Sequence, residues 1–435
     1  MRLSKAFDIV PGDVVAFIGA GGKTSLLVGL GYELAEAGWR VLATTTTQLS
    51  TDQLLLFPRV MSSRDDARAI SQALSDDQFV LLHEDIRAGR VYGPPPSWTR
   101  DLLDSVDSDI LLVEADHAAG LPFKAPRADE PIIPLETSLV VPVASLSALG
   151  VPLDDAHIYN PAAMIDRYGF ARNTPVKSAW LAQVLRDETL GLRGLPESAR
   201  VVVYVNQVPA GGYALGRARL IARLCLQNPR IHGVALGSVR GFAPVAELQR
   251  ALGAIVLSGR AEGGAEKVAR TSEQLMRARI NHIRVITGAG AAQVCAAVKR
   301  LGLRTIHDRR YRRGGAVSAL AAGFRALPAH VAAALVLSPQ GNFLTPKLVY
   351  QLLTAFYRGD GDFIVAGAGQ AETALAIIGR RHWADITALP PAASLGAVIQ
   401  QFQARIALLD TQTGLALPGI EAATVDDRPF WSRSR

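Results

Sequence analysis

The sequence predicts an α/β protein with two doubly wound domains, and three observations support this fold class. Hydrophobic residues make up 49% and charged residues 20% of the 435 residues, a composition typical of buried parallel strands under packed helices. Short apolar runs alternate with helical patterns along the chain. The chain is also longer than one hydrophobic core accommodates, so more than one domain is expected.

A strand, a glycine loop and a helix open the predicted first domain. Residues 14–18 form an apolar run, the loop follows, and residues 25–37 have helical periodicity that ends at Gly38. A second strand is expected at residues 40–44. The order strand, loop, helix, strand is typical of the start of a parallel sheet with both faces covered.

Further strands continue this sheet before the pattern restarts. Apolar runs predict strands at 80–82, 110–113, 139–143, 201–205 and 231–235. The alternation then begins again, with a helix that ends at Arg279 and with strands at 254–257, 283–287, 333–337 and 363–366. We therefore expect a first domain at residues 1–244 and a second at residues 245–435.

The bulk properties exclude several classes of protein. The first ten residues lack a signal-peptide core, and no stretch reaches the roughly 18 apolar residues of a membrane span, so we expect a cytoplasmic protein without a membrane partner. Cys225 and Cys295 lie far apart, which argues against a disulfide framework or a cysteine metal site. The net charge of +7 favours anionic ligands such as nucleotides. The dense basic run at 309–313 is interpreted as solvated loop charge, and no nucleic-acid partner is expected.

The glycine loop of the first domain predicts a site for a nucleoside triphosphate with Mg²⁺. Backbone N–H groups of a glycine turn and of a helix N-terminus hold phosphates, and Lys23 adds a charge toward the outer phosphates. The Thr24 hydroxyl can ligate Mg²⁺ at the head of the helix. The strict pattern G-x-x-x-x-G-K-[ST] is not met, because Phe17 stands five positions before Gly22. The shorter G-x-x-G-K-T loop resembles the ATP loop of Mur-type amide ligases.

Two carboxylates follow an apolar run of the same predicted sheet. Glu114 and Asp116 stand at i and i+2 after the run that ends at residue 113, so they point to the same side of a strand and can share one metal ion or one water molecule. For either residue, the alternative is that it caps the following turn or pairs with Lys124 or Arg127. The predicted metal ligands are thus Thr24, Glu114 and Asp116.

A threonine run, residues 44–47, follows the second strand. Hydroxyls at the carboxyl ends of strands face the ligand crevice of such sheets, so Thr46 is a candidate phosphate or metal contact. A threonine run is also typical of an ordinary strand. The sequence thus predicts ATP and Mg²⁺ as cofactors. Lys23, Glu114 and Asp116 are the predicted catalytic residues, and the predicted nucleotide-binding residues are Gly19, Ala20, Gly21, Gly22, Lys23, Thr24 and Thr46.

These motifs together resemble the YqeC family over about residues 10–240. The matching segments are Val15–Thr24, Val41–Thr47, Val113–Asp116, Gly120–Pro126 and Glu130–Pro134. Members are regarded as accessory factors of selenium-dependent molybdenum hydroxylases. The resemblance implies nucleotide binding and a role in maturing such an enzyme or its cofactor, with a molybdopterin-type cofactor or the hydroxylase as partner. His117 departs from the pattern, which has glycine there. The segment Asn206-Gln207-Val208 is similar to the Asn-Lys-x-Asp motif of GTPases but lacks its Lys and Asp, so guanine specificity is not inferred.

The second half resembles the nucleotidyltransferase domain of the MobA and MocA type, which attaches a nucleotide to the molybdenum cofactor. The resemblance implies a Rossmann-like fold and rests on Ala254–Arg260, His307, Asp308, Tyr311, Gly314, Gly315, Ser318, Gly323 and Leu344–Pro346. Its catalytic features are incomplete. The glycine-rich loop is shortened to Ser258–Gly264, and Lys267 is the one basic residue that can still serve it. Gln340 replaces the metal-binding aspartate, and a neutral amide binds Mg²⁺ far more weakly than a carboxylate. Asp410 is a candidate remnant of a second ligand.

Three functions stay open at this point. The leading hypothesis is a Mg²⁺-dependent ATPase, or an ATP-dependent ligase or transferase, that serves as a maturation factor and carries a degenerate, inactive transferase domain. The second is a molybdenum cofactor cytidylyltransferase active in the C-terminal half. The third is a non-enzymatic scaffold that uses the nucleotide as a switch.

Overall fold

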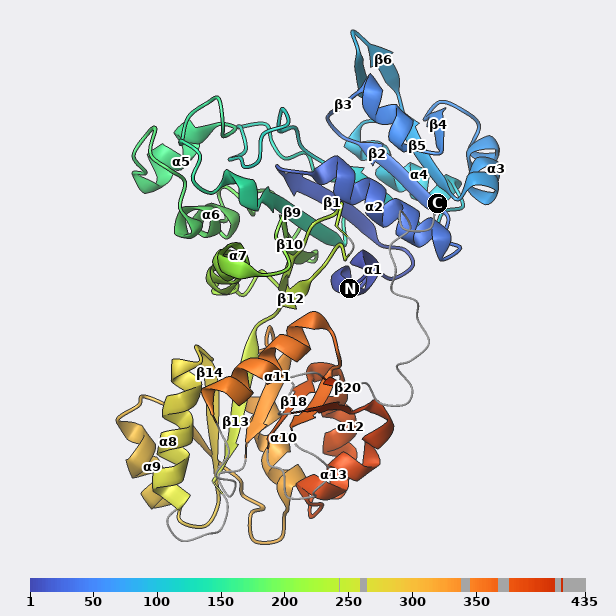
Figure 1. Ribbon diagram of the computed structural model, residues 1–435. Coiled ribbons are helices and arrows are strands. Elements are labelled where there is room, and N and C mark those ends of the chain that lie inside the picture. The colour runs from blue at the N-terminus through green and yellow to red at the C-terminus, as the bar shows by residue number, and fades with distance from the viewer. Residues whose placement is uncertain (242, 259–263, 338–344, 367–374, 411–415, 418–435) are drawn as a thin grey trace. The chain divides into compact units, whose positions relative to one another are not determined.

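The chain divides into two compact units, each with its own sheet and helices (Figure 1). The computed structural model describes residues 1–435 except 242, 259–263, 338–344, 367–374, 411–415 and 418–435. The first unit is Met1–Gln249 and the second begins at Arg250. Both units have the alternating α/β organisation, which confirms the predicted fold class.

The first unit contains a sheet that is nine-stranded within the described residues. Its strand order is β12-β11-β10-β9-β1-β8-β2-β5-β4, and the neighbours are parallel except β11 and β12. The strands are β1 (Val14–Gly19), β2 (Val41–Thr45), β4 (Arg59–Ser62), β5 (Phe79–His83), β8 (Ile110–Glu114), β9 (Leu139–Ser145), β10 (Arg200–Asn206), β11 (Gly233–Leu236) and β12 (Glu247–Gln249). The helices are α1 (Leu3–Phe7), α2 (Lys23–Glu36), α3 (Ala67–Asp77), α4 (Thr99–Ser105), α5 (Pro161–Tyr168), α6 (Ser178–Leu185) and α7 (Gly212–Cys225).

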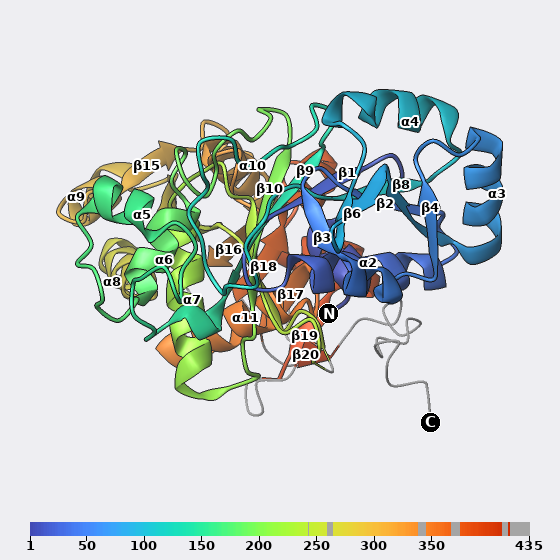
Figure 2. The same ribbon diagram turned by 90° about the horizontal axis from the view of Figure 1, so that it is seen from above.

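Alternating side chains of this sheet fill separate cores on its two faces. In β1, Val15 and Phe17 pack with residues of α1 and α2, whereas Val14 and Ala16 pack with residues of α3 and α4 on the other face. Successive side chains of a strand point to opposite faces, so a strand covered on both faces is apolar at every position. Helices α5, α6 and α7 gather at the opposite end of the unit from α3 and α4 (Figure 2).

Every strand predicted for the first half is present, but strand β4, a second small sheet and strand β12 were not predicted. A separate antiparallel sheet, in the order β3-β7-β6, is formed by β3 (Gln48–Ser50), β6 (Asp85–Arg87) and β7 (Arg90–Tyr92). Strand β12 lies beyond the boundary expected at residue 244. Because β12 pairs with β11, the first unit continues to Gln249, and the assignment of domains to 1–244 and 245–435 remains a prediction.

A buried carboxylate orders the turn after α6. Asp187 accepts hydrogen bonds from the backbone N–H and hydroxyl of Thr189, from the Tyr168 hydroxyl and from Arg167. Burial by itself would raise the pKa of Asp187, but these donors lower it to about 2. The charged form of Asp187 therefore stabilises the folded state.

The second unit has an eight-stranded sheet within the described residues, in the order β15-β14-β13-β16-β18-β17-β19-β20. Its strands are β13 (Leu252–Leu257), β14 (His282–Thr287), β15 (Arg304–His307), β16 (Ala333–Leu337), β17 (Phe363–Ala366), β18 (Leu375–Gly379), β19 (Ala407–Leu409) and β20 (Ala416–Leu417). The helices are α8 (Gly264–Arg277), α9 (Ala291–Lys299), α10 (Ala316–Ala326), α11 (Pro346–Arg358), α12 (Trp383–Ala388) and α13 (Leu395–Gln401). Strand β18, which was not predicted, is antiparallel to β16 and β17. None of the helices in the described ranges has the length and apolar character needed to cross a membrane.

Candidate functional site

A cavity of about 920 Å³ lies at the carboxyl ends of the parallel strands of the first unit. The strand order places β1 in the middle, with β8 on one side and β9 on the other. Ligands of open α/β sheets bind at such a point, where the strand order reverses. The lining comes from the glycine loop, from the segments after β2 and β8, from β7, and from the ends of β9, β10 and β11.

The glycines of the loop are required by close approach of the neighbouring strands. Gly19, Gly21 and Gly22 have φ of +91°, +81° and +123°, a region that favours glycine. A Cβ atom on Gly21 would lie 2.6 Å from the Ser145 Cβ and 2.7 Å from the Pro122 carbonyl oxygen. The loop therefore packs its backbone directly against the ends of the adjacent strands.

The head of α2 presents a row of unpaired backbone N–H groups. The helix begins at Lys23, and Gly22 provides no side-chain cap. The Gly19 N–H donates to Asp116, the Ala20 N–H donates to the Val143 carbonyl, and Leu26 donates to Gly22. Within the described part of the chain, the N–H groups of residues 21–25 have no protein acceptor. Such a row at a helix N-terminus binds anions.

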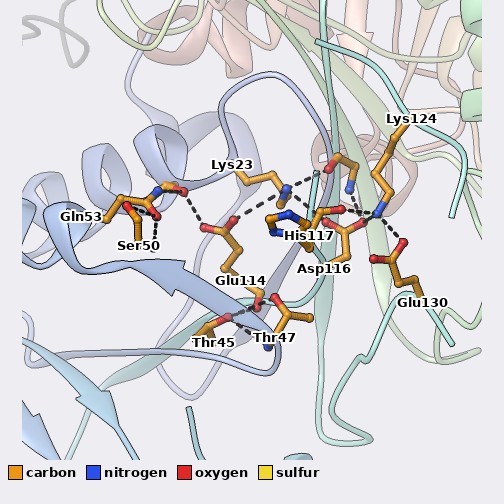
Figure 3. Close-up of polar contacts among 12 residues, drawn as sticks. Lys23, Thr45, Thr47, Ser50, Gln53, Glu114, Asp116, His117, Lys124 and Glu130 are labelled. Atoms are coloured by element: carbon orange, nitrogen blue, oxygen red, sulfur yellow. Dashed lines mark hydrogen bonds and ion pairs between the residues drawn. The ribbon is translucent and has the colours of Figure 1, made fainter. Parts of the chain in front are cut away.

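Lys23 lies buried between the two predicted carboxylates (Figure 3). Its Nζ donates to the Gly19 carbonyl oxygen at 2.9 Å and lies 3.2 Å from Asp116 Oδ1 and 3.6 Å from Glu114 Oε1. Burial lowers the pKa of Lys23, but the charges of Asp116 and Glu114 outweigh it and raise the pKa above its ordinary value. The amine is therefore charged at neutral pH.

Glu114 and Thr24 form a pair of oxygens that fits a Mg²⁺ ion. The Thr24 hydroxyl donates to Glu114 Oε2 at 2.7 Å, and Gln53 Nε2 donates to Thr24 Oγ1 at 2.9 Å. All three residues line the cavity. Burial raises the pKa of Glu114 although Lys23 is near, so the nearby positive charge does not fully compensate this buried carboxylate. A hard cation with oxygen ligands would supply the missing positive charge.

Asp116 differs from Glu114 in direction and partners. It is 2% exposed and does not line the cavity. Its Oδ2 accepts the Gly19 N–H at 2.8 Å and lies 3.1 Å from Lys124 Nζ. Both carboxylates thus contact Lys23, but only Glu114 lines the cavity, whereas Asp116 also pairs with Lys124. The assignment of both carboxylates as metal ligands remains a prediction.

Lys124 links Asp116 to the loop that follows β8. Its Nζ donates to Glu130 Oε2 at 2.8 Å and to the His117 carbonyl oxygen at 2.6 Å (Figure 3). Burial opposes ionisation of Glu130, yet the contact with Lys124 lowers its pKa. The pairing of Asp116 with Lys124, stated above as an alternative, is therefore present. This network holds residues 117–122, which line the cavity.

Thr46 does not reach the cavity. Its hydroxyl donates to the Ile132 carbonyl oxygen at 2.7 Å, and Thr46 is not among the lining residues. Thr45 instead donates to the backbone carbonyl of Glu114 at 2.9 Å. Thr45 thus ties β2 to β8, and the Thr46 hydroxyl ties the segment after β2 to the segment that follows β8.

Several lining residues escaped the sequence analysis. Gln53 and Arg90 belong to segments without a recognisable motif. Asn206 joins the glycine loop to the neighbouring strands: its Nδ2 donates to the Gly21 carbonyl oxygen at 2.8 Å, and its Oδ1 accepts the backbone N–H groups of Gln207 and Val239. The partial similarity to a GTPase motif was the available signal for Asn206.

The second unit has a cavity of about 630 Å³ beside the basic run, lined by Arg309, Arg310 and Arg325 among others. Asp308 is buried there and accepts the Ser318 hydroxyl at 2.9 Å. Gln340 and most of the shortened loop, residues 259–263, lie outside the described residues, whereas Lys267 lies in α8 and Asp410 directly follows β19. No cluster of three or more His, Cys, Asp or Glu side chains suited to a metal ion is found among the residues that the structure describes.

Comparisons with known proteins show that the two halves of the chain match different family models. Residues 15–162 match the YqeC protein family, and residues 261–406 match the MobA-like NTP transferase domain. The uncharacterized protein YqeC of Escherichia coli (strain K12) is 28% identical over 234 residues, which cover 54% of this chain and 90% of that protein.

Similar solved structures include molybdopterin-guanine dinucleotide biosynthesis protein A from Archaeoglobus fulgidus, which is 12% identical with a TM-score of 0.29 over 37% of this chain and 84% of that chain. A nucleotidyl transferase from Methanothermobacter thermautotroptrophicus is 14% identical with a TM-score of 0.31 over 39% and 86%. The chain thus joins a region that matches the YqeC family to a region that matches the MobA-like NTP transferase domain, and both predicted resemblances are confirmed.

Proposed function

We propose that the first unit binds ATP with Mg²⁺ and that the protein acts as an accessory factor in the maturation of a selenium-dependent molybdenum hydroxylase or of its cofactor. The observation that carries the nucleotide site is the row of unpaired N–H groups at residues 21–25 beside the buried, charged Lys23. The YqeC and MobA-like matches support a role related to the molybdenum cofactor.

The residues of the glycine loop and their neighbours have distinct tasks in this proposal. The N–H groups of residues 21–25 cradle the phosphates, and Lys23 neutralises the outer ones. Thr24 and Glu114 hold Mg²⁺, which, when bound, offsets the charge that develops on the transferred phosphoryl group. Asp116 keeps the Lys23 ammonium and the Gly19 N–H in place, so the loop is preorganised before the nucleotide arrives.

The residues that read guanine in GTPases are absent, so GTP is not proposed as the nucleotide. Gln207 stands where the GTPase motif has lysine, and Asn206 is occupied in holding the glycine loop and the end of β11. In this proposal the adenine base lies near Gln207 and Ser238, which line the cavity on the β10 and β11 side.

Calorimetric titration of ATP, GTP and CTP with Mg²⁺ tests the site directly. We expect the wild type to bind ATP selectively and Lys23→Ala to lose this binding. Lys177→Ala is the matched control, because Lys177 lies over the Trp180 ring and does not line the cavity. Unchanged binding in Lys23→Ala would move the nucleotide away from this cavity, and no binding by the wild type would reject the function.

The maturation role requires a test in cells. Hydroxylase activity should fall when wild type is replaced by Lys23→Ala and should persist with Lys177→Ala. If Lys23→Ala abolished ATP hydrolysis but left maturation intact, the protein would be a non-enzymatic scaffold rather than a factor driven by ATP hydrolysis.

A cytidylyltransferase activity in the second unit is the second candidate, favoured by the MobA-like match. Incubation with CTP and molybdopterin measures it, with a cytosine dinucleotide as product. We expect no product, because Gln340 replaces the carboxylate on which two-metal chemistry depends. Formation of the dinucleotide would establish this activity.

A further inference from the structure

Two arginines line the ATP cavity without a carboxylate partner among the described residues. Arg90 and Arg240 are both exposed lining residues, and the salt bridges of the described chain include neither of them. They come from segments on opposite sides of β1 in the strand order. Arg90 belongs to β7, whose partner β3 follows β2, whereas Arg240 follows β11. The two guanidinium groups are thus available to different ends of an anionic ligand.

The pairing of β3 with β7 directs Arg90 into the cavity. Leu49 is paired with Val91, and Ser50 with Arg90. Leu49 and Val91 are buried in the hydrophobic core. Strands β3, β7 and β6 form a small ribbon. Because side chains alternate along a strand, the face of this ribbon opposite to Leu49 and Val91 carries Ser50 and Arg90, and both line the cavity.

Hydrogen bonds connect this face of the ribbon to the proposed Mg²⁺ ligands. The Ser50 N–H donates to Gln53 Oε1 at 2.7 Å, and Gln53 Nε2 donates to Thr24 Oγ1 at 2.9 Å. Thr24 in turn donates to Glu114. The backbone of Arg90 is therefore linked, through its strand partner Ser50 and then Gln53, to Thr24 and Glu114, the residues that would bind the metal (Figure 3 shows Ser50, Gln53 and Glu114).

The charge of Arg90 also acts on the Lys23 end of the cavity. Burial lowers the pKa of His117, and the charges of Lys23 and then Arg90 lower it further. His117 follows β8, on the same side of β1 as Arg90. In nucleoside triphosphate sites the metal bridges the outer phosphates, so the terminal phosphate belongs on this side and the base on the side of Arg240.

We propose that Arg90 binds the terminal phosphate of the nucleotide and makes the site discriminate triphosphate from diphosphate, while Arg240 contacts the part that both nucleotides share. This proposal rests on the proposed ATP site. A planar guanidinium matches the geometry of a phosphate oxygen pair and forms charge-assisted hydrogen bonds with it. The small β3-β7-β6 sheet is then the element that reports the state of the nucleotide.

Titrations of ATP and ADP, each with Mg²⁺, into wild type and variants test the proposal. Arg90→Gln should weaken ATP binding by about 10- to 100-fold, the range expected for lost hydrogen bonds to a charged group, and change ADP binding by less than about threefold. Arg240→Gln should weaken both nucleotides equally. Arg87→Gln is the matched control on the same ribbon, because Arg87 pairs with Asp85 and does not line the cavity. Circular dichroism should show that all three variants are folded.

The outcomes separate this proposal from the ATP site itself. If Lys23→Ala loses binding but Arg90→Gln weakens ATP and ADP equally, or neither, the role of Arg90 is overturned while the ATP site stands. If the wild type binds neither nucleotide, the site fails and the role of Arg90 fails with it. Recovery of part of the ATP affinity in Arg90→Lys would support a charge contact with the terminal phosphate.

Discussion

Asp116→Asn and Glu114→Gln make the same chemical change two residues apart, and the structure predicts opposite consequences. Each substitution removes a buried negative charge and keeps the shape of the side chain. Asp116 contacts two buried ammonium groups, Lys23 at 3.2 Å and Lys124 at 3.1 Å, whereas Glu114 lies 3.6 Å from Lys23 and faces the cavity. We expect Asp116→Asn to destabilise the fold and Glu114→Gln to leave it intact while Mg²⁺-dependent binding is lost.

The expected change in the free energy of unfolding follows from the ion pairs that each lysine retains. Leaving a buried charge without its partner costs about 3–5 kcal/mol. In Asp116→Asn, Lys23 keeps Glu114 and Lys124 keeps Glu130, so we expect the lower end, about 3 kcal/mol. For Glu114→Gln we expect a change in the free energy of unfolding within about 1 kcal/mol, because burial already raises the pKa of Glu114 and the neutral amide avoids that cost.

Urea unfolding and calorimetry together measure both effects. With a slope of about 2–3 kcal/mol per molar urea, Asp116→Asn should lower the midpoint of the first unit by roughly 1 M. Tryptophan fluorescence reports this transition, since Trp39, Trp98 and Trp180 belong to the first unit. Glu114→Gln should keep the midpoint but lose the Mg²⁺ dependence of ATP binding. The reasoning is refuted if Asp116→Asn keeps the wild-type midpoint and loses the Mg²⁺ dependence instead.

Gly21→Ala places its Cβ 2.6 Å from the Ser145 Cβ, so calorimetry should show loss of ATP binding. Gly216 is an exposed position of α7, and nothing lies within 4 Å of a Cβ added there. Gly216→Ala should therefore raise the free energy of unfolding by about 0.5–1 kcal/mol. Because the folded-state pKa of Asp187 is lowered to about 2, its stabilisation of about 2 kcal/mol is complete above about pH 4 and is lost between about pH 4 and pH 2. Urea midpoints of wild type and Asp187→Asn should converge over that interval, and a constant gap would contradict this origin. Asn206→Ala removes three hydrogen bonds around the loop and should cost about 2 kcal/mol in unfolding free energy and weaken ATP binding; wild-type affinity would show that the loop holds its shape without Asn206.

Much of the fold and the centre of the site were predictable because they depend on local patterns. The apolar run of β1, the glycines and the periodicity of α2 lie within one continuous segment, Val14–Glu36. The short spacing of Glu114 and Asp116 keeps both near Lys23. Only Glu114 belongs to β8 and lines the cavity, so the alternation of the strand did not decide the direction of Asp116.

Tertiary structure decided which partner each polar side chain meets. Asp116 turns to Lys124 and the Gly19 N–H, Thr46 turns to the Ile132 carbonyl, and Gln53 reaches Thr24 from a segment 29 residues away. The direction of β18 and the pairing that brings Arg90 to the cavity depend likewise on contacts between distant segments. Period and propensity act over a few neighbouring residues, so the sequence by itself determined the elements and the glycine loop. The pairing of buried charges and hydrogen-bond donors depends on which segments the folded chain brings together, so the packed sheet determined which side chains face the cavity.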